Sequence, residues 1–453
     1  MNLLNSKSNS ATKKSFSVAN LKSKFQQIWH VSLYSNAIYL VVSNAISSLI
    51  GFIFWIIAAR LYTTEQVGLA SAVIGAVGLV TSVSHLGMSM GLVRFLPDDE
   101  KQANDVINTF TTIGLITTGL TALIFIGGLS IWSSALLFLR QDLIHFIDFI
   151  ALCLGNQLLT VTQYVFIAKR RSGYVTLQTS IFNVLRLLLV VVFAYSLHSD
   201  GIIYAWTISL ILVPLICIAV LLPRVQSHYR PSFKIDKKIV SRVLSFSLAN
   251  YIAMTFSVLP GTIFPLMVVN LLGADSNAYF YIAWTIGTIL PGIAGGVTTS
   301  LFAEGSKDEK TLETNIWRSL KMSFIIVVPL TVLVMFIAPI LLRLYGHSYA
   351  DNGMSVLRLV VLASVPTILN AIYVSIKRVE KNMKALVIFS CVQGIASVLL
   401  ALLLIKLLGL NGLGIAWLSV QTALALFVVI RAPQLAHLIK KLRQLSSHEK
   451  PSG

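Results

Sequence analysis

Hydrophobic residues occur along the chain in long runs that short polar segments separate. A helix of about twenty apolar residues crosses the hydrocarbon core of a bilayer, which is roughly 30 Å thick. Because lipid offers no partner to an unpaired backbone group, each such run is predicted to be a transmembrane helix. The pattern therefore predicts an all-α membrane protein. We count twelve spans, at residues 32–59, 67–95, 106–131, 143–168, 174–197, 201–223, 242–270, 277–303, 319–345, 353–376, 384–407 and 411–432.

The positions of the basic residues predict the orientation of these spans. Lys and Arg that flank a span stay on the cytoplasmic side. With the N-terminus inside, the segments on that side hold 29 of the 35 Lys and Arg residues, and the outer loops hold four, namely Arg60, Arg140, Arg343 and Lys406. This split predicts a multi-pass protein of the plasma membrane with both termini in the cytoplasm. It also supports the number of spans, because one missed helix would exchange the sides of all later loops.

A basic, proline-containing loop divides the chain into two halves of six spans each. Residues 60–68 and the Gly-rich span behind them resemble residues 270–278 and the span that follows, at an offset of 210 residues. An even number of spans per half gives both halves the same orientation, so a pseudo-two-fold axis should run along the membrane normal, with a central cavity between two bundles. The predicted segments are a basic cytoplasmic tail at 1–30, a six-helix bundle at 31–223, a cytoplasmic linker at 224–238, a second bundle at 239–432 and a basic cytoplasmic tail at 433–453.

The composition excludes several classes of protein. Hydrophobic residues make up 56% of the chain and charged residues only 11%, whereas soluble domains have about 25% charged residues. The net charge of +18 lies beside the spans, so we predict no binding to nucleic acid. Cys153, Cys217 and Cys391 have no neighbour at metal-ligand or redox spacing. Without a phosphate-binding Gly-rich loop or a His-Glu-x-x-His motif, we expect neither an enzyme nor a cofactor or metal.

A polar stripe with one cation lies along the fifth span. Thr176, Thr179, Asn183 and Arg186 are spaced by three, four and three residues, which places them on one helix face. Arg186 lies near the membrane midplane, where an ionisable side chain costs about 2.5 to 3.5 kcal/mol. The stripe is then the wall of a cavity in which the planar guanidinium binds an anionic group such as phosphate. Alternatively, helix carbonyls or a neighbouring helix satisfy Arg186.

Two further ionisable residues lie inside spans, Asp148 and Arg358, and they are also 210 residues apart. Each lies about five residues from the outer end of its span. Our hypothesis is that they face each other across the cleft and form a charge pair when the outer side is closed. Two alternatives stay open: Asp148 couples transport to an ion or a proton with the help of His145, or it has a local structural role.

His85, on the second span, is a secondary candidate. A single histidine in a span is more often a packing residue with its polar atoms satisfied than a binding group. The glycines around it let helices approach closely and slide past each other.

Residues 58–97 resemble the first part of the Wzx-type polysaccharide transporters, the oligosaccharide-lipid flippases of the multidrug/oligosaccharidyl-lipid/polysaccharide (MOP) exporter superfamily. The family pattern ARLLGPEEFGL is met at residues 59–69 as ARLYTTEQVGL, and the pattern GLxxxLVRFLP is met at residues 87–97 as GMSMGLVRFLP. Two departures stand out. Residues 62–64 replace the Gly-Pro turn, and the copy in the second half lacks the Arg and the Pro.

The resemblance implies a cargo and a mechanism. The cargo is an anionic, polyprenyl-pyrophosphate-linked oligosaccharide, which alternating opening of the two bundles moves from the cytoplasmic to the outer leaflet for polysaccharide biosynthesis. Membrane lipids are implied partners, and a polysaccharide polymerase and glycosyltransferases are candidate partners. Two other functions stay open. A cation-coupled multidrug or metabolite antiporter of the same superfamily needs carboxylates in its spans, and a non-transporting scaffold for polysaccharide assembly needs no cavity.

Overall fold

The computed structural model describes residues 32–96, 100–197, 200–227, 229–293, 295–296 and 312–431. The predicted tails at 1–30 and 433–453 and the end of the predicted span 277–303 lie outside these residues. Every regular element in the described part of the chain is helical. The prediction of an all-α protein is therefore confirmed.

The first half consists of six spans. They are α2 (Ser32–Leu61), α3 (Thr64–Ser84) with α4 (Met88–Phe95), α5 (Glu100–Gly127), α8 (Leu143–Ala168), α9 (Ser172–Ser196), and α10 (Gly201–Ile216), which continues through η2 (Cys217–Leu221) into α11 (Leu222–Val225). Three short elements connect α5 to α8, namely α6 (Leu129–Trp132), η1 (Ser134–Leu136) and α7 (Phe138–Gln141).

The second half has the same plan. Its helices are α12 (Lys237–Leu272), α13 (Ala274–Gly287), α15 (Leu312–Arg343), α16 (His347–Leu362) with α17 (Ser364–Val379), α18 (Met383–Leu408) and α19 (Leu410–Arg431). Within the described ranges, ten helical segments are long and apolar enough to cross a membrane, and α2 adds an apolar stretch at Ile46–Leu61. With α13, these segments account for the predicted plan of about twelve spans.

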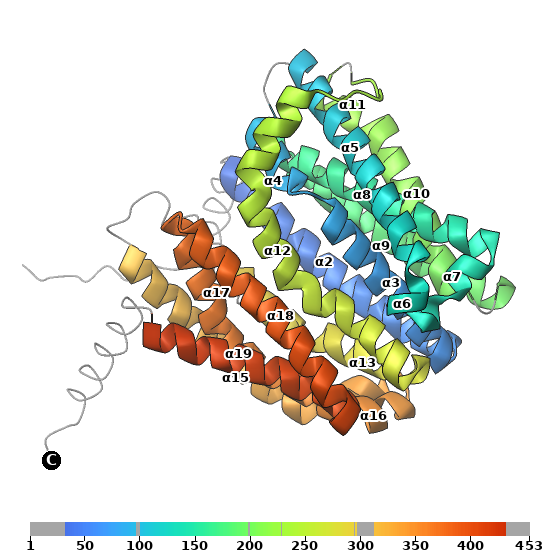
Figure 1. The fold of residues 1–453 in the computed structure, drawn as a ribbon, viewed down its shortest axis with the longest axis vertical. Helices are drawn as coiled ribbons and strands as arrows, with labels where there is room; N and C mark the ends of the chain where they lie inside the picture. Colours follow the sequence, from blue (N-terminus) through green and yellow to red (C-terminus); the bar gives the residue numbers. More distant parts are fainter. Residues whose placement is uncertain are drawn as a thin grey trace, which may run out of the picture.

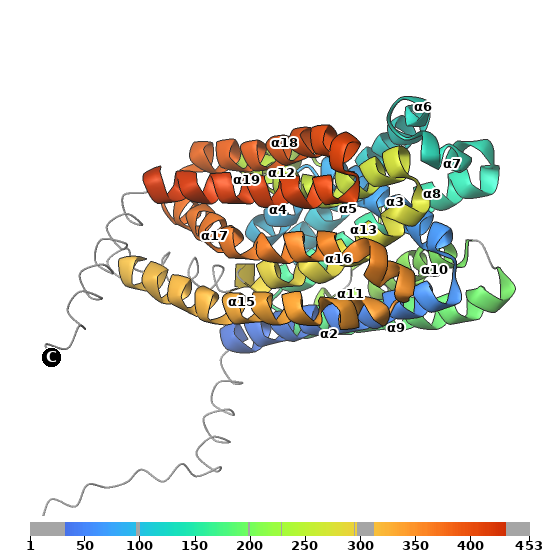
Figure 2. The same cartoon turned by 90° about the horizontal axis from the view of Figure 1, so that it is seen from below.

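The helices of each half pack mainly with one another. In the first half α9 packs between α2 and α10, and in the second half α12 packs against α18 and α15 against α16. The exception is α3, which packs against α12 and α13 of the other half. Figures 1 and 2 accordingly show α3, α12 and α13 between the remaining helices of the two halves. We call the end of the molecule where α2 ends and α3 begins the outer end, because the loop charges predict that it faces outward. The opposite end is the inner end.

The sequence explains where α3 begins and why the second span is broken. Thr63 and Gln66 form a capping box, in which each side chain accepts a hydrogen bond from the other residue's backbone N–H. We predicted one helix over 67–95, but the structure separates α3 from α4 because Leu86 and Gly87 have φ angles of 47° and 72°. Glycine adopts such angles without steric cost. The carbonyl of Ser84, freed by the break, accepts a hydrogen bond from Thr117 of α5.

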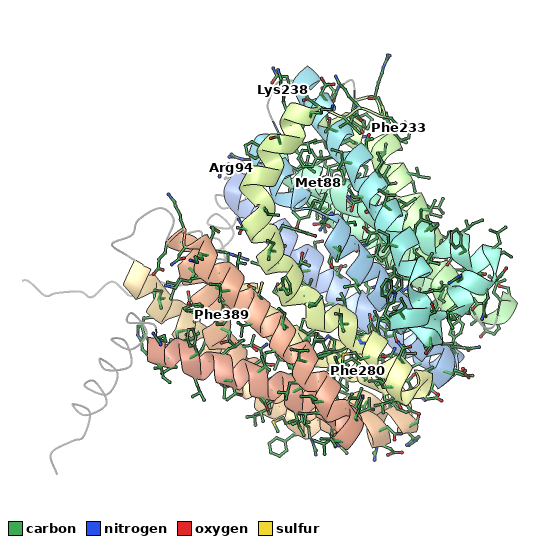
Figure 3. The ribbon with its side chains drawn as sticks, in the orientation of Figure 1. Met88, Arg94, Phe233, Lys238, Phe280 and Phe389 are labelled. Carbon is green, nitrogen blue, oxygen red and sulfur yellow. The ribbon has the colours of Figure 1, made fainter. Side chains whose placement is uncertain are left out.

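Several side chains of α5 bind the predicted linker, and Asn108 makes four of the hydrogen bonds. Nδ2 of Asn108 donates to the carbonyl of Arg230 and to Oγ of Ser232, and its Oδ1 accepts from the hydroxyl of Tyr229 and the N–H of Ser232. Burial raises the pKa of Tyr229 to about 12, so this hydroxyl stays a donor at neutral pH. The linker also displays Phe233, whose side chain is 91% exposed, near Lys238 at the inner end (Figure 3).

Candidate functional site

Arg186 lies in a cage of aromatic rings. Its Cζ is 4.9 Å from the ring centre of Phe54 on α2, 5.1 Å from Phe182 on α9 and 4.7 Å from Trp206 on α10. The side chain is only 6% exposed. A guanidinium held over aromatic faces at these distances is attracted to the negative faces of the rings, most strongly where water is excluded. Three helices of the first half therefore keep one cation buried.

The cage leaves two hydrogen-bond donors unused. Among the described residues, neither Nε of Arg186 nor Nε1 of Trp206 has a hydrogen-bond partner. A buried donor without a partner costs about 1 to 3 kcal/mol. Gly51 of α2 makes room for the guanidinium, since a Cβ at this position would lie 3.4 Å from Nη2. The arrangement suits a ligand that brings oxygen acceptors.

The cage lies at the boundary between the two halves. Tyr281, on α13 of the second half, lies near Arg186, and its ring lies 5.0 Å from that of Trp55, centre to centre. On the other side, Trp206 and Asn156 line a cavity of about 200 Å³ between α3, α8 and α10. The sequence analysis missed the aromatic residues because each lies in an apolar run where an aromatic side chain is unremarkable. Only their proximity to Arg186 in space gives them a role.

Other polar residues of the stripe form hydrogen bonds within the first half. Asn183 is buried and donates from Nδ2 to Oγ of Ser47 on α2 at 3.0 Å and to the carbonyl of Thr179 at 2.8 Å. Thr176 donates to the carbonyl of Ser172. Asn183 and Arg186 thus both lie against α2. The predicted stripe exists as one face, but Asn183 fixes α9 to α2, and Arg186 is the member with a donor left over.

The structure does not bring Asp148 and Arg358 together. Asp148 is buried inside the first half, close to Thr207 of α10. Arg358 is exposed, and its Nε donates to the carbonyl of Met335 on α15 at 3.4 Å. In the described parts of the chain no ion pair joins the two. Their offset of 210 residues reflects equivalent positions in the two halves, but each side chain points into or along its own half.

His145 and His85 both have partners. At the outer end, Nδ1 of His145 lies 2.9 Å from Oδ2 of Asp142, and its Nε2 lies 3.5 Å from Oδ2 of Asp200. With Asp148 nearby, these groups form an acidic cluster in the first half. At the end of α3, Nδ1 of His85 lies 2.9 Å from Oε1 of Gln157 on α8. His85 therefore fits the packing interpretation.

Two side chains that the sequence analysis did not single out as site residues join the halves at the outer end. Arg60 donates from Nε to the carbonyl of Leu344 at 2.9 Å and from Nη2 to the carbonyl of Arg343 at 2.8 Å. Asn270 accepts at Oδ1 from the N–H of Ala135 and donates from Nδ2 to Oγ of Ser133, each at 3.0 Å. The signal was present in the sequence, because residues 60 and 270 are the first positions of the two repeat segments.

A second pair of contacts joins α3 to α13 at the same end. Nδ2 of Asn277 donates to the carbonyl of Gly68 at 2.7 Å and to Oγ of Ser71 at 3.0 Å. The hydroxyl of Thr64 donates to the carboxylate of Asp275. The outer end is therefore closed by direct hydrogen bonds between the halves.

A lateral groove of about 660 Å³ also lies between the halves. Apolar side chains of α3, α5, α12 and α18 line most of it, and Ser133, Ser134 and Asn270 lie at its outer end. Its walls belong to membrane-spanning helices, so it is a surface for hydrocarbon.

The chain matches the family model described as polysaccharide biosynthesis protein over residues 33–303, more than half of its length. No curated protein sequence matches it. Its fold is similar to that of the lipid II flippase MurJ in an inward closed conformation, with 15% identity, a TM-score of 0.68 and 87% of each chain covered. It is also similar to an inward-facing multidrug resistance MATE family transporter of the MOP superfamily, with 17% identity, a TM-score of 0.65, and 90% of this chain and 96% of that chain covered. For an outward-facing MATE family transporter the coverage is the same, the identity is 17% and the TM-score is 0.59.

These neighbours are transporters and flippases that share a fold with this chain over nearly its whole length. The chain has the fold of these MOP-type neighbours and is a multi-pass membrane protein, as its sequence predicted. The chain belongs to the polysaccharide biosynthesis protein family.

Proposed function

We propose that the protein is a flippase that moves polyprenyl-pyrophosphate-linked oligosaccharide repeat units across the cytoplasmic membrane. The observation that carries this proposal is the buried cation of Arg186 at the boundary between the halves, together with the unused donors at Nε of Arg186 and Nε1 of Trp206. A pyrophosphate is an anion with many oxygen acceptors. It would satisfy both donors and repay the cost of burying them.

The lipid part of this cargo also has a suitable surface. The lateral groove of about 660 Å³ offers hydrocarbon walls to a polyprenyl chain. In the orientation that the charges favour, with both termini in the cytoplasm, the cargo enters from the inner end. Transfer then requires the contacts at the outer end to break while the inner end closes, which is alternating access.

Transport in proteoliposomes tests the proposal. The cargo is a polyprenyl-pyrophosphate-linked oligosaccharide with a fluorescent sugar, and a membrane-impermeant quencher reports the share in the outer leaflet. We expect Arg186→Ala and Arg186→Gln to lower the transfer rate by at least about tenfold, because a charge-assisted hydrogen bond is worth roughly 1.5 to 3 kcal/mol. Arg186→Lys should keep part of the activity, since it keeps the charge but loses the planar fork.

Arg358→Ala is the matched control, because Arg358 is also an arginine within a span but is exposed, and its Nε donates a hydrogen bond to α15. It should transfer cargo at a rate within about twofold of the unchanged protein, as surface substitutions usually have small effects. Full activity of Arg186→Ala would refute the proposal and favour the scaffold.

The acidic cluster of Asp142, Asp148 and Asp200 around His145 favours a second candidate, the cation-coupled antiporter. Asp148→Asn separates the two. It preserves the shape of the side chain and removes only its charge, so a flippase for an anionic lipid should keep its transfer rate. An antiporter should lose exchange driven by an imposed proton or sodium gradient, because its only carboxylate buried within a described span would be neutral.

A further inference from the structure

The contacts of Arg60 and Asn270 are related by the internal repeat. Arg60 and Asn270 are 210 residues apart, and their partners lie in corresponding segments, since residues 133–135 in the first half correspond to residues 343–345 in the second at the same offset. Arg60 of the first half donates to the carbonyls of Arg343 and Leu344. Asn270 of the second half binds Ser133 and Ala135. In each half, therefore, the residue at the equivalent position binds the equivalent segment of the other half.

Such reciprocal contacts are typical of two-fold symmetry. When a residue of one half contacts a segment of the other half, the equivalent residue of the other half contacts the equivalent segment of the first half. The starts of α3 and α13 meet between the two contacts. There Asn277 binds Gly68 and Ser71, and Thr64 binds Asp275. Equivalent elements that face each other mark the position of the pseudo-two-fold axis. The two long-range contacts thus lie on opposite sides of the axis, where rotation of one half against the other separates them most.

We infer that Arg60 and Asn270 form a reciprocal latch that holds the outer end closed, and that both contacts must break before cargo can leave outward. Both side chains bind mainly backbone or small groups of the opposite half, and their contacts span more than 130 residues of sequence. Neither residue has an acidic partner among the described residues, so the latch consists of hydrogen bonds to backbone groups and to small hydroxyl side chains. Opening the outer end exposes these groups to water, which replaces the lost bonds and keeps the difference between the two states small.

The inference rests on alternating access within the proposed function, but it does not depend on the identity of the cargo. The experiment therefore measures the outer end directly. Spin labels are placed at Gln141→Cys and His347→Cys, two exposed positions on opposite halves of the outer end. The background is free of cysteine, with Cys153, Cys217 and Cys391 replaced by alanine. Double electron–electron resonance in lipid nanodiscs then gives the distribution of distances between the labels without any cargo.

We expect Arg60→Ala and Asn270→Ala each to increase the ratio of open to closed molecules by roughly tenfold, and the double variant to increase it further, because each removes two hydrogen bonds from the closed state only. Asn270→Asp should have an intermediate effect, since its carboxylate still accepts from Ala135 and can accept from the hydroxyl of Ser133, but it faces the carbonyl of Leu266 and the C-terminal end of α12, where a negative charge is unfavourable. This milder variant tests the latch even if an alanine variant fails to fold.

Arg140→Ala is the matched control, an exposed arginine at the same end that is outside the latch. It should leave the distances unchanged. The latch is refuted if Arg60→Ala and Asn270→Asp give the same distances as Arg140→Ala. If the variants open as expected but the protein moves no lipid-linked oligosaccharide, the latch hypothesis stands and only the proposed cargo is disproved.

Discussion

Gly68 of α3 lies directly against the backbone of Ala274 at the start of α13, so closely that a Cβ on Gly68 would be 1.8 Å from the carbonyl oxygen of Ala274. No real Cβ tolerates that distance, so the two helices can meet here only because residue 68 is glycine. The contact lies between the two latch contacts, at the position of the pseudo-two-fold axis. The two halves can therefore approach this closely at the outer end only because Gly68 has no Cβ.

Gly68→Ala should therefore open the outer end. The added methyl group meets backbone on the other half, so α3 and α13 must separate, and the hydrogen bonds of Asn277 to Gly68 and Ser71 are lost with the contact. The distance distribution between labels at the outer end should shift to longer values. Gly119→Ala is the control, because its nearest neighbour would be a side-chain atom of Leu154 at 3.9 Å, an ordinary contact. Unchanged distances in Gly68→Ala would mean that the halves close by another route.

The break between α3 and α4 depends on Gly87. This residue has a φ angle of 72°, which costs a residue with a Cβ about 1 kcal/mol or more. Gly87→Ala should lower thermal stability in detergent by that amount. Gly127→Ala provides the comparison, since a Cβ there would meet nothing within 4 Å and the φ angle is not positive. Equal stability of the two variants would show that the break does not need glycine.

Asn108→Ala should loosen the linker on α5. The substitution removes four hydrogen bonds to residues 229–232, each worth about 0.5 to 1.5 kcal/mol. Trypsin should then cut after Lys234 at least about tenfold faster, because cleavage follows the population of the open form. Tyr229→Phe removes one of the four bonds and should give a smaller increase. If the cleavage rate is the same in all three proteins, Asn108 does not hold the linker.

The sequence predicted the spans well because the bilayer imposes a strong rule on each of them. Length and hydropathy alone locate a helix that must satisfy its own backbone in lipid. The break after His85 and the separation of α16 from α17 were missed, because each depends on a few backbone angles within a run that is apolar on both sides. Gly87 was visible, but a glycine in a span has several structural uses.

The candidate site was harder to predict because it depends on contacts between distant segments. Arg186 could be identified because a charged side chain within a span is costly in lipid. Its spacing from Asn183 placed both residues on one face of α9, and in the structure both lie against α2. The rings of Phe54 and Trp206 come from two other helices, and no pattern within one helix marks them. For Asp148 and Arg358, the repeat offset indicated equivalence, but equivalent positions around an axis need not touch. The same offset was more informative at Arg60 and Asn270, since these lie at the ends of helices where the halves meet.

Trp206 offers a test that separates binding from stability. Its Nε1 is buried without a hydrogen-bond partner among the described residues, and its ring covers Arg186. Trp206→Phe keeps an aromatic face over the guanidinium and removes the unused donor. The variant should therefore be as stable as the unchanged protein or more stable, because an unsatisfied buried donor is destabilising. If Nε1 binds an oxygen of the cargo, the same variant should bind that cargo more weakly.

The matched control is Trp417→Phe in the second half, since Nε1 of Trp417 is also buried and without a partner in the described part of the chain, while its ring packs on Trp284 and not on Arg186. Both variants should move the melting temperature in the same direction. Only Trp206→Phe should weaken the binding of a polyprenyl-pyrophosphate lipid, by at least about tenfold, the value of one hydrogen bond to a charged group. Thermal shift and equilibrium binding in the same detergent give both quantities. Equal binding by the two variants would exclude Trp206 from the cargo site. The unpaired Nε1 would then only lower the stability of the fold.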